Sequence, residues 1–172
     1  PRQGDGPPDE WHGYHVDDLL VDVDLFRRLR ARGQARGADG IADLAQALHL
    51  VQGQPFDQLR EQGWNWLLDG DRLQDLIPSA IVDTAHVVVL DALQRGDLKA
   101  AREGAETACM AAPYDEVSRL DLAKVMEVQG HGAAADQMLR AKVFDRRDDH
   151  EPPVDLPART KEIAAKNECN NT

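Results

Sequence analysis

The sequence predicts an all-α protein, and three observations lead to this prediction. Aromatic residues make up 5% of the 172-residue chain while alanine and leucine are abundant, which favours helices packed through small side chains. Apolar residues recur at three- and four-residue spacing, as on the buried face of a helix. Glycine-led segments that begin at Gly96 and Gly130 lie 34 residues apart, a period typical of repeated helix pairs. The length fits one domain.

The N-terminal part is expected to contain a lead-in and a first helix. Residues 1–20 are rich in proline and glycine near their start and are predicted to be flexible or extended. Asp22 or Asp24 is expected to cap the first helix, and Gly33 and Gly37 are expected to end it. The apolar stripe of this helix consists of Leu25, Phe26 and Leu29.

Two further apolar stripes follow. A second helix is predicted over residues 39–51 and is stopped by the segment 53–55, which contains Gly and Pro. A loop over residues 56–69 separates it from a long stripe that runs from Leu73 to Gly96. Pro78 lies inside this stripe, so we expect a kink there or two abutting helices.

The remaining segments are bounded by glycine and proline, which interrupt helices. The predicted helices cover residues 97–112, 115–129 and 132–147, followed by a linker over 148–157, a short helix over 158–166 and a polar tail over 167–172.

Composition limits the classes of function. The net charge of -11 opposes a phosphate backbone and suits a basic partner surface. The chain contains no apolar run long enough to span a membrane and no secretory signal at its start. Cys109 and Cys169 form no CxxC motif, which favours a reducing, cytoplasmic setting.

The repeated unit is similar to the tetratricopeptide helix pair. Residues 82–113 place Gly96 at the turn, Ala101 and Ala108 at the small packing positions, and Pro113 at the end. The next copy is less regular: it has Gly130 at the turn and Ala135 at the first small position, but Lys142 where alanine is expected. About three antiparallel helix pairs are predicted.

The order of several segments resembles the bacterial transcriptional activator domain, the helical domain of actinobacterial antibiotic-regulatory proteins and related regulators. The segments are residues 21–29 (VDVDLFRRL), 45–56 (AQALHLVQGQPF), Trp66, 113–116 (PYDE) and Gly130 with its alanines. The resemblance covers residues 21–147 and implies a tetratricopeptide-like, right-handed helical array.

The resemblance also implies a function and leaves an alternative open. In such regulators the domain follows a winged-helix DNA-binding domain and mediates dimerisation or contacts with the transcription machinery. About twenty residues precede the domain here, which is too few for a winged helix. The same helical domain also occurs in envelope-associated proteins, so an accessory role in such a protein is the alternative.

Candidate partner-binding residues lie on the predicted helices. Stacked helix pairs leave one extended groove free, and the first helix of each pair would present Asp83, His86 and Arg119 there. Five arginines in ten residues, Arg28 and Arg32 among them, could meet phosphate or an acidic partner, so direct DNA binding through residues 27–36 is an alternative. The other interpretation of these arginines is a solvated face paired with carboxylates.

Two aromatic side chains and two histidines complete the candidates. Trp64 and Trp66 could anchor a partner or cover the core of their own domain. His12 and His15 beside carboxylates could ligate a metal, but their spacing is not diagnostic and an exposed polar edge is favoured. The chain contains no GxSxG, HExxH, P-loop or GxGxxG motif, so no catalytic residue, metal or cofactor is expected.

Overall fold

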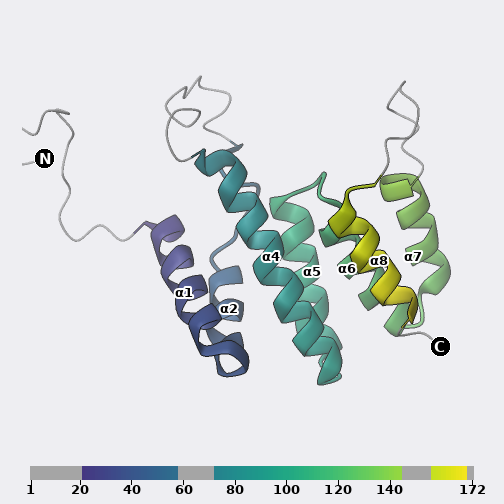
Figure 1. The fold of residues 1–172 in the computed structure, drawn as a ribbon, viewed down its shortest axis with the longest axis horizontal. Coiled ribbons are helices and arrows are strands. Elements are labelled where there is room, and N and C mark those ends of the chain that lie inside the picture. The colour runs from purple at the N-terminus through teal and green to yellow at the C-terminus, as the bar shows by residue number, and fades with distance from the viewer. Residues whose placement is uncertain (1–20, 58–71, 145–155, 170–172) are drawn as a thin grey trace, which may run out of the picture.

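The protein is all-α in the part of the chain that the structure describes. The computed structural model describes residues 21–57, 72–144 and 156–169, which contain helices and turns but no strand (Figure 1). The predicted lead-in over residues 1–20, Trp64 and Trp66, and most of the predicted linker and tail lie outside these residues.

The first two helices form a close hairpin. α1 spans Asp22–Arg36, a 3-10 turn η1 spans Gly37–Gly40, and α2 spans Ile41–Leu48. Both predictions of how α1 begins were wrong, because the helix starts after Val21 without a side-chain cap. The second helix is also shorter than predicted, since its first residues form the 3-10 turn.

Two glycines allow the hairpin to close. Gly33 was expected to end α1, but it lies buried inside the helix, and Gly37 ends it with a φ of 58°. A Cβ atom on Gly40 would lie 1.9 Å from the carbonyl oxygen of Gly33. A Cβ atom on Gly33 would in turn lie 2.6 Å from the Cδ2 atom of Leu44. The backbones of α1 and η1 therefore touch at a point where no side chain fits.

A single long helix, α4, spans Leu73–Gln94. It contains Pro78 in its second turn, so the expectation of two abutting helices was wrong. Pro78 removes one backbone hydrogen bond of α4, and the helix continues through it. α4 packs against α2, α5 and α6. Its buried residues are Ile77, Ile81, Val82, Thr84, Ala85, Val88, Val89 and Ala92.

The next two helices begin one residue after their predicted starts, and each has an aspartate as its cap. α5 spans Leu98–Ala111 and α6 spans Glu116–Val128. The side chain of Asp97 accepts a hydrogen bond from the amide of Ala100, and that of Asp115 accepts one from the amide of Ser118. These bonds satisfy amides that have no partner within the helix.

The two glycines that were predicted to lie at turns do lie in turns between helices. Gly96 and Gly130 have φ angles of 72° and 87°, a region that favours glycine because it has no Cβ atom. Ala101 and Ala108 are buried, as expected for small packing positions. A methyl group added at Gly104 would lie 3.2 Å from Val89, so α4 and α5 approach closely here.

The C-terminal helices differ in part from the prediction. α7 spans Gly132–Leu139 and continues as a π-helical turn, η3, over Arg140–Phe144. Ala135 is buried and Lys142 is exposed, which agrees with the irregular second copy of the repeat. α8 spans Ala158–Cys169 and includes the predicted short helix. It packs on α6.

Among the described helices, α4 alone is long and apolar enough to cross a membrane. Its most apolar window has a mean hydropathy of 1.6. A core helix has the same properties, and α4 supplies residues to both hydrophobic clusters of the protein. It also carries Asp83 and Asp91, each paired with arginine.

We predict that Gly40→Ala destabilises the protein by about 1–3 kcal/mol, the usual range for overpacking, because the added methyl group meets backbone atoms that cannot move aside. Urea unfolding measures the change. Gly132→Ala is the matched control, since a Cβ atom at this position has open space and alanine suits the start of α7. Equal midpoints for Gly40→Ala and the wild type would contradict the close approach of α1 and η1.

Candidate functional site

Most of the arginine-rich segment of α1 is used to hold the fold together. Arg32 donates two hydrogen bonds to the carboxylate of Asp43 in α2, with distances of 2.9 Å from Nε and 2.6 Å from Nη2. Arg36 donates a third to the same carboxylate at 3.2 Å. Arg28, by contrast, is exposed. Arg32 thus joins α1 to α2 although more than half of its side chain is exposed, and no ion pair of Arg28 is seen among the described residues.

The arginine pairs account for the electrostatics of Asp43. The hydrogen bonds from Arg32 hold the pKa of this carboxyl below its ordinary value, with a further contribution from the charge of Arg36. Asp43 is buried in the hairpin, and the bidentate pair satisfies both of its oxygens. The structure therefore shows the carboxylate-paired interpretation for Arg32 and Arg36.

Asp83 lies where three helices meet. From α4 it contacts Arg30 of α1 at 3.7 Å and Arg159 of α8, which donates a hydrogen bond to its Oδ1 atom. Figure 1 shows α1 and α8 on either side of α4 in this view. This candidate residue from the sequence thus belongs to the exposed face of α4, between its two neighbours.

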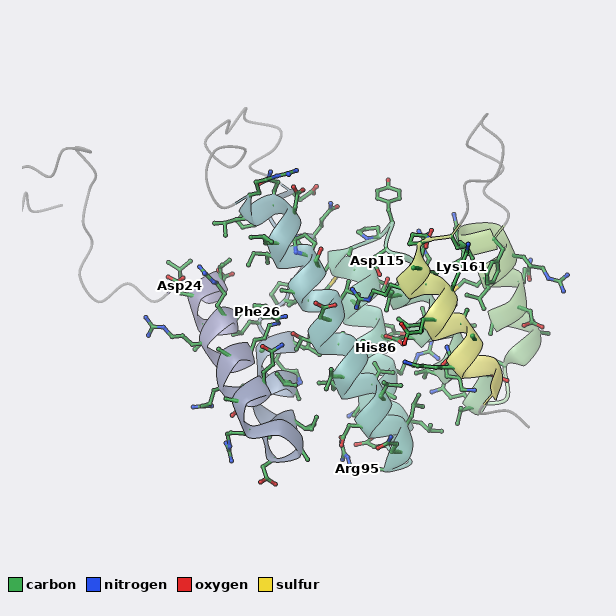
Figure 2. All side chains as sticks on the ribbon, in the orientation of Figure 1. Asp24, Phe26, His86, Arg95, Asp115 and Lys161 are labelled. Atoms are coloured by element: carbon green, nitrogen blue, oxygen red, sulfur yellow. The ribbon has the colours of Figure 1, made fainter. Side chains whose placement is uncertain are left out.

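His86 lies one helical turn beyond Asp83 and is paired across the helix interface. Its Nδ1 atom lies 2.8 Å and 3.0 Å from the two carboxylate oxygens of Asp121 in α6. The Asp121 side chain is 3% exposed and that of His86 is 21% exposed. Figure 2 labels His86 on the α4 ribbon, near α8. The pair ties α4 to α6 directly below the face that α8 covers.

The pKa values of both partners lie above their ordinary values, for different reasons. The hydrogen bond to Asp121 raises the pKa of His86 above its ordinary value, although burial opposes this. Burial raises the pKa of Asp121, and its contact with His86 opposes that shift. Both groups therefore bind protons more tightly in the folded protein than in the unfolded chain.

Arg119, the third groove candidate, does not join this pair. Its Nη1 atom donates a hydrogen bond to the carbonyl oxygen of Lys142 at 2.7 Å, and its Nη2 atom donates to that of Pro113. The guanidinium thus connects the turn before α6 to η3. These hydrogen bonds hold two segments of the fold together, and they do not involve Asp83 or His86.

The sequence did not indicate what covers the α4–α6 face. The Thr160 hydroxyl of α8 donates to Glu116 of α6 at 2.8 Å, and the ammonium of Lys124 donates to the carbonyl oxygen of Asn167 at 3.4 Å. We call Asp83, Glu116 and Lys124 the α8 seat, because each bonds to α8. The feature of the sequence that could have indicated this contact is the pattern of Arg159, Thr160 and Ile163, which lie on one face of the predicted short helix.

Exposed apolar side chains continue the α4 face beyond the α8 seat. Val87 and Leu90 are 44% and 41% exposed, and they follow Asp83 at helical spacing on the same helix. The face thus combines a carboxylate, a histidine and two uncovered aliphatic side chains. Such a mixture is typical of protein-interaction surfaces.

A second concave site lies at the N-terminal end of the array. This cleft has a volume of about 700 Å³ and lies between α1, the turn after α2, and α4. It is lined mainly by apolar residues, among them Val23, Phe26, Val51, Phe56, Ile77 and Ile81. Phe56 has a φ of 61°, which is rare for a residue with a side chain.

The described residues contain no group of three or more His, Cys, Asp or Glu side chains placed to hold a metal ion. His12 and His15 lie outside these residues. Burial raises the pKa of the Cys109 thiol, which donates a hydrogen bond to the carbonyl oxygen of Ser118 at 3.4 Å. A protonated, half-buried thiol in this position has a packing role.

Comparisons of the chain with protein families, curated proteins and solved structures gave no match. The candidate site therefore rests on the residues themselves.

We predict that the stability of the protein falls as the pH rises from about 6 to about 8, because the folded-state pKa of His86 is raised and the stabilisation it gives is lost above the unfolded value of about 6.5. His86→Gln should flatten this dependence. Thermal unfolding across this pH range measures it, with the exposed His49→Gln as the control. An unchanged slope in His86→Gln would show that the pair does not govern the effect.

Proposed function

We propose that the chain is a non-enzymatic protein-interaction and regulatory domain, which acts through the exposed face of α4 and its border with α6. One observation carries the proposal: this face already receives a helix, α8, through the three residues of the α8 seat. A surface that binds one helix through charged and hydroxyl groups has the chemistry to bind another.

The proposed architecture is a tetratricopeptide-like, right-handed array of three helix pairs. In support, α1 packs on α2, α4 on α5 and α6 on α7, and α2 also packs on α4 and α5 on α6. Turn glycines with positive φ separate α4 from α5 and α6 from α7. In such an array the first helix of each pair lines one common face, which here would belong to α1, α4 and α6.

We further propose that the domain is part of a larger transcriptional regulator of the activator-domain type, in which it mediates oligomerisation or contact with a protein partner. The order of segments between residues 21 and 147 supports this. The gene that encodes the chain is expected to encode a DNA-binding domain as well. Membrane spans in that gene product would instead favour the accessory module of an envelope-associated protein.

A photo-crosslinking amino acid placed at Val87 is expected to trap a second copy of the chain or a protein partner, because Val87 lies uncovered beside the α8 seat. Met110 on α5 is the matched control, with 41% exposure against 44% for Val87. Mass spectrometry of the adducts measures the result in purified protein and in cells. Absence of adducts at both positions, or equal adducts at both, would contradict the assignment of this face.

We predict that the isolated chain does not shift a DNA duplex in a gel at low salt. The net charge of -11 opposes the phosphate backbone, and Arg32 and Arg36 are occupied by Asp43. The variant Asp43→Asn tests whether the pairing with Asp43 is what keeps Arg32 and Arg36 from binding DNA, because it removes the charge that pairs both arginines. A shift with the wild-type chain would restore direct DNA binding through residues 27–36 as the function.

A further inference from the structure

α8 fits the α4–α6 face through a short, regular pattern. Arg159, Thr160, Ile163, Ala164 and Asn167 follow one another at spacings of one, three, one and three residues, which places them on one side of a helix. Thr160 is 3% exposed and Ile163 is 9% exposed, whereas the opposite side of α8 faces solvent. The contact thus uses a single face of α8.

The charges on the two sides of this contact are complementary. The α8 seat offers the carboxylates of Asp83 and Glu116 to the guanidinium of Arg159 and the hydroxyl of Thr160. Lys124, at the other end of the seat, donates to the carbonyl oxygen of Asn167 in the last turn of α8, where a cation suits the helix dipole. The seat therefore selects a helix that begins with a cation and a hydroxyl, and it fixes the direction in which that helix lies.

The packing of α8 is sparse compared with that of its neighbours. Among the apolar side chains of α8 that the structure describes, Ile163 lies in the core and Ala164 packs against it partly buried, whereas α5 buries Ala101, Gly104, Ala105, Ala108 and Ala111. A cleft of about 330 Å³ stays open between α8, α6 and α7, bordered by Ala164 and Asn167. The salt bridge of Arg159 is half exposed, and such pairs add little stability. A helix with few buried contacts opens at a lower free energy than the whole domain.

We propose that α8 is an intramolecular ligand that occupies the partner-binding face, and that the partner is a helix with the same pattern: an Arg, a Thr or Ser next to it, and an aliphatic residue three positions further on. This inference rests on the proposed function. α8 must leave the α8 seat before the partner helix binds there, so the domain is closed until α8 is displaced.

The test uses the full chain and a fluorescent peptide with the sequence of residues 156–168. In the variant Arg159→Glu, α8 is repelled from Asp83, and the seat is open more often. Because apparent affinity scales with the open fraction, the variant should bind the peptide about tenfold more tightly than the wild-type chain. Fluorescence anisotropy measures the binding. Lys142→Glu, which makes the same charge change at an exposed position of η3 outside α8, should leave the affinity at the wild-type value.

A second variant shows where the peptide binds. Asp83→Lys added to Arg159→Glu restores an opposite-charge pair within the chain and repels the arginine of the peptide, so the tight binding should be lost. Equal peptide affinity in the wild type and in Arg159→Glu, or the same gain in Lys142→Glu, would overturn the proposal.

Hydrogen exchange distinguishes a failure of this inference about α8 from a failure of the proposed function. In Arg159→Glu the amides of α8 should exchange faster while those of α4 and α6 stay protected. If α8 amides exchange only with global unfolding, α8 does not gate the face and the inference is overturned. Crosslinking at Val87 in the Arg159→Glu chain, in which the seat is open, tests the proposed function separately, because the result there does not depend on whether α8 gates the face of the wild-type chain.

Discussion

The structure depends on the burial of α4, which is apolar on most of its surface. Ile81, Val82 and Ala85 belong to one hydrophobic cluster, and Val89 and Ala92 belong to the other. A helix with this distribution cannot stay in water, so α2, α5 and α6 must pack around it. These three helices leave one strip of α4 uncovered, and every residue of the proposed interaction face on α4 lies on that strip.

Polar contacts then decide how the other helices lie around α4. The Asp43 carboxylate closes the α1–α2 hairpin, Asp121 joins α6 to His86, and Asp83 connects α1 and α8. A buried carboxylate without a partner would be costly, so the positions of Asp43 and Asp121 admit few arrangements. The chain carries many acidic residues, and part of its acidity is thus structural. The rest leaves a surface that suits a basic helix.

Local signals in the sequence predicted which segments are helical better than they predicted where each helix begins and ends. Asp97, Gly96 and Gly130 act within a few residues of the chain, so the starts of α5 and the turns before α5 and α7 were predictable. Gly33 was misread because its role is contact with Gly40 in three dimensions and not local chain direction. At Pro78 the sequence left a kink or two abutting helices open, and the structure has one continuous helix.

By itself, the sequence determined that the chain is helical, where the long apolar stripe lies, and that Asp83 and His86 share a face of one helix. These properties follow from periodicity and capping, which depend on neighbours along the chain. Only the tertiary structure decided that Arg119 and Arg32 serve the fold and that α8 covers the face of Asp83. Those contacts join residues 11 to 76 positions apart, and no local pattern encodes which distant group a charged side chain will meet.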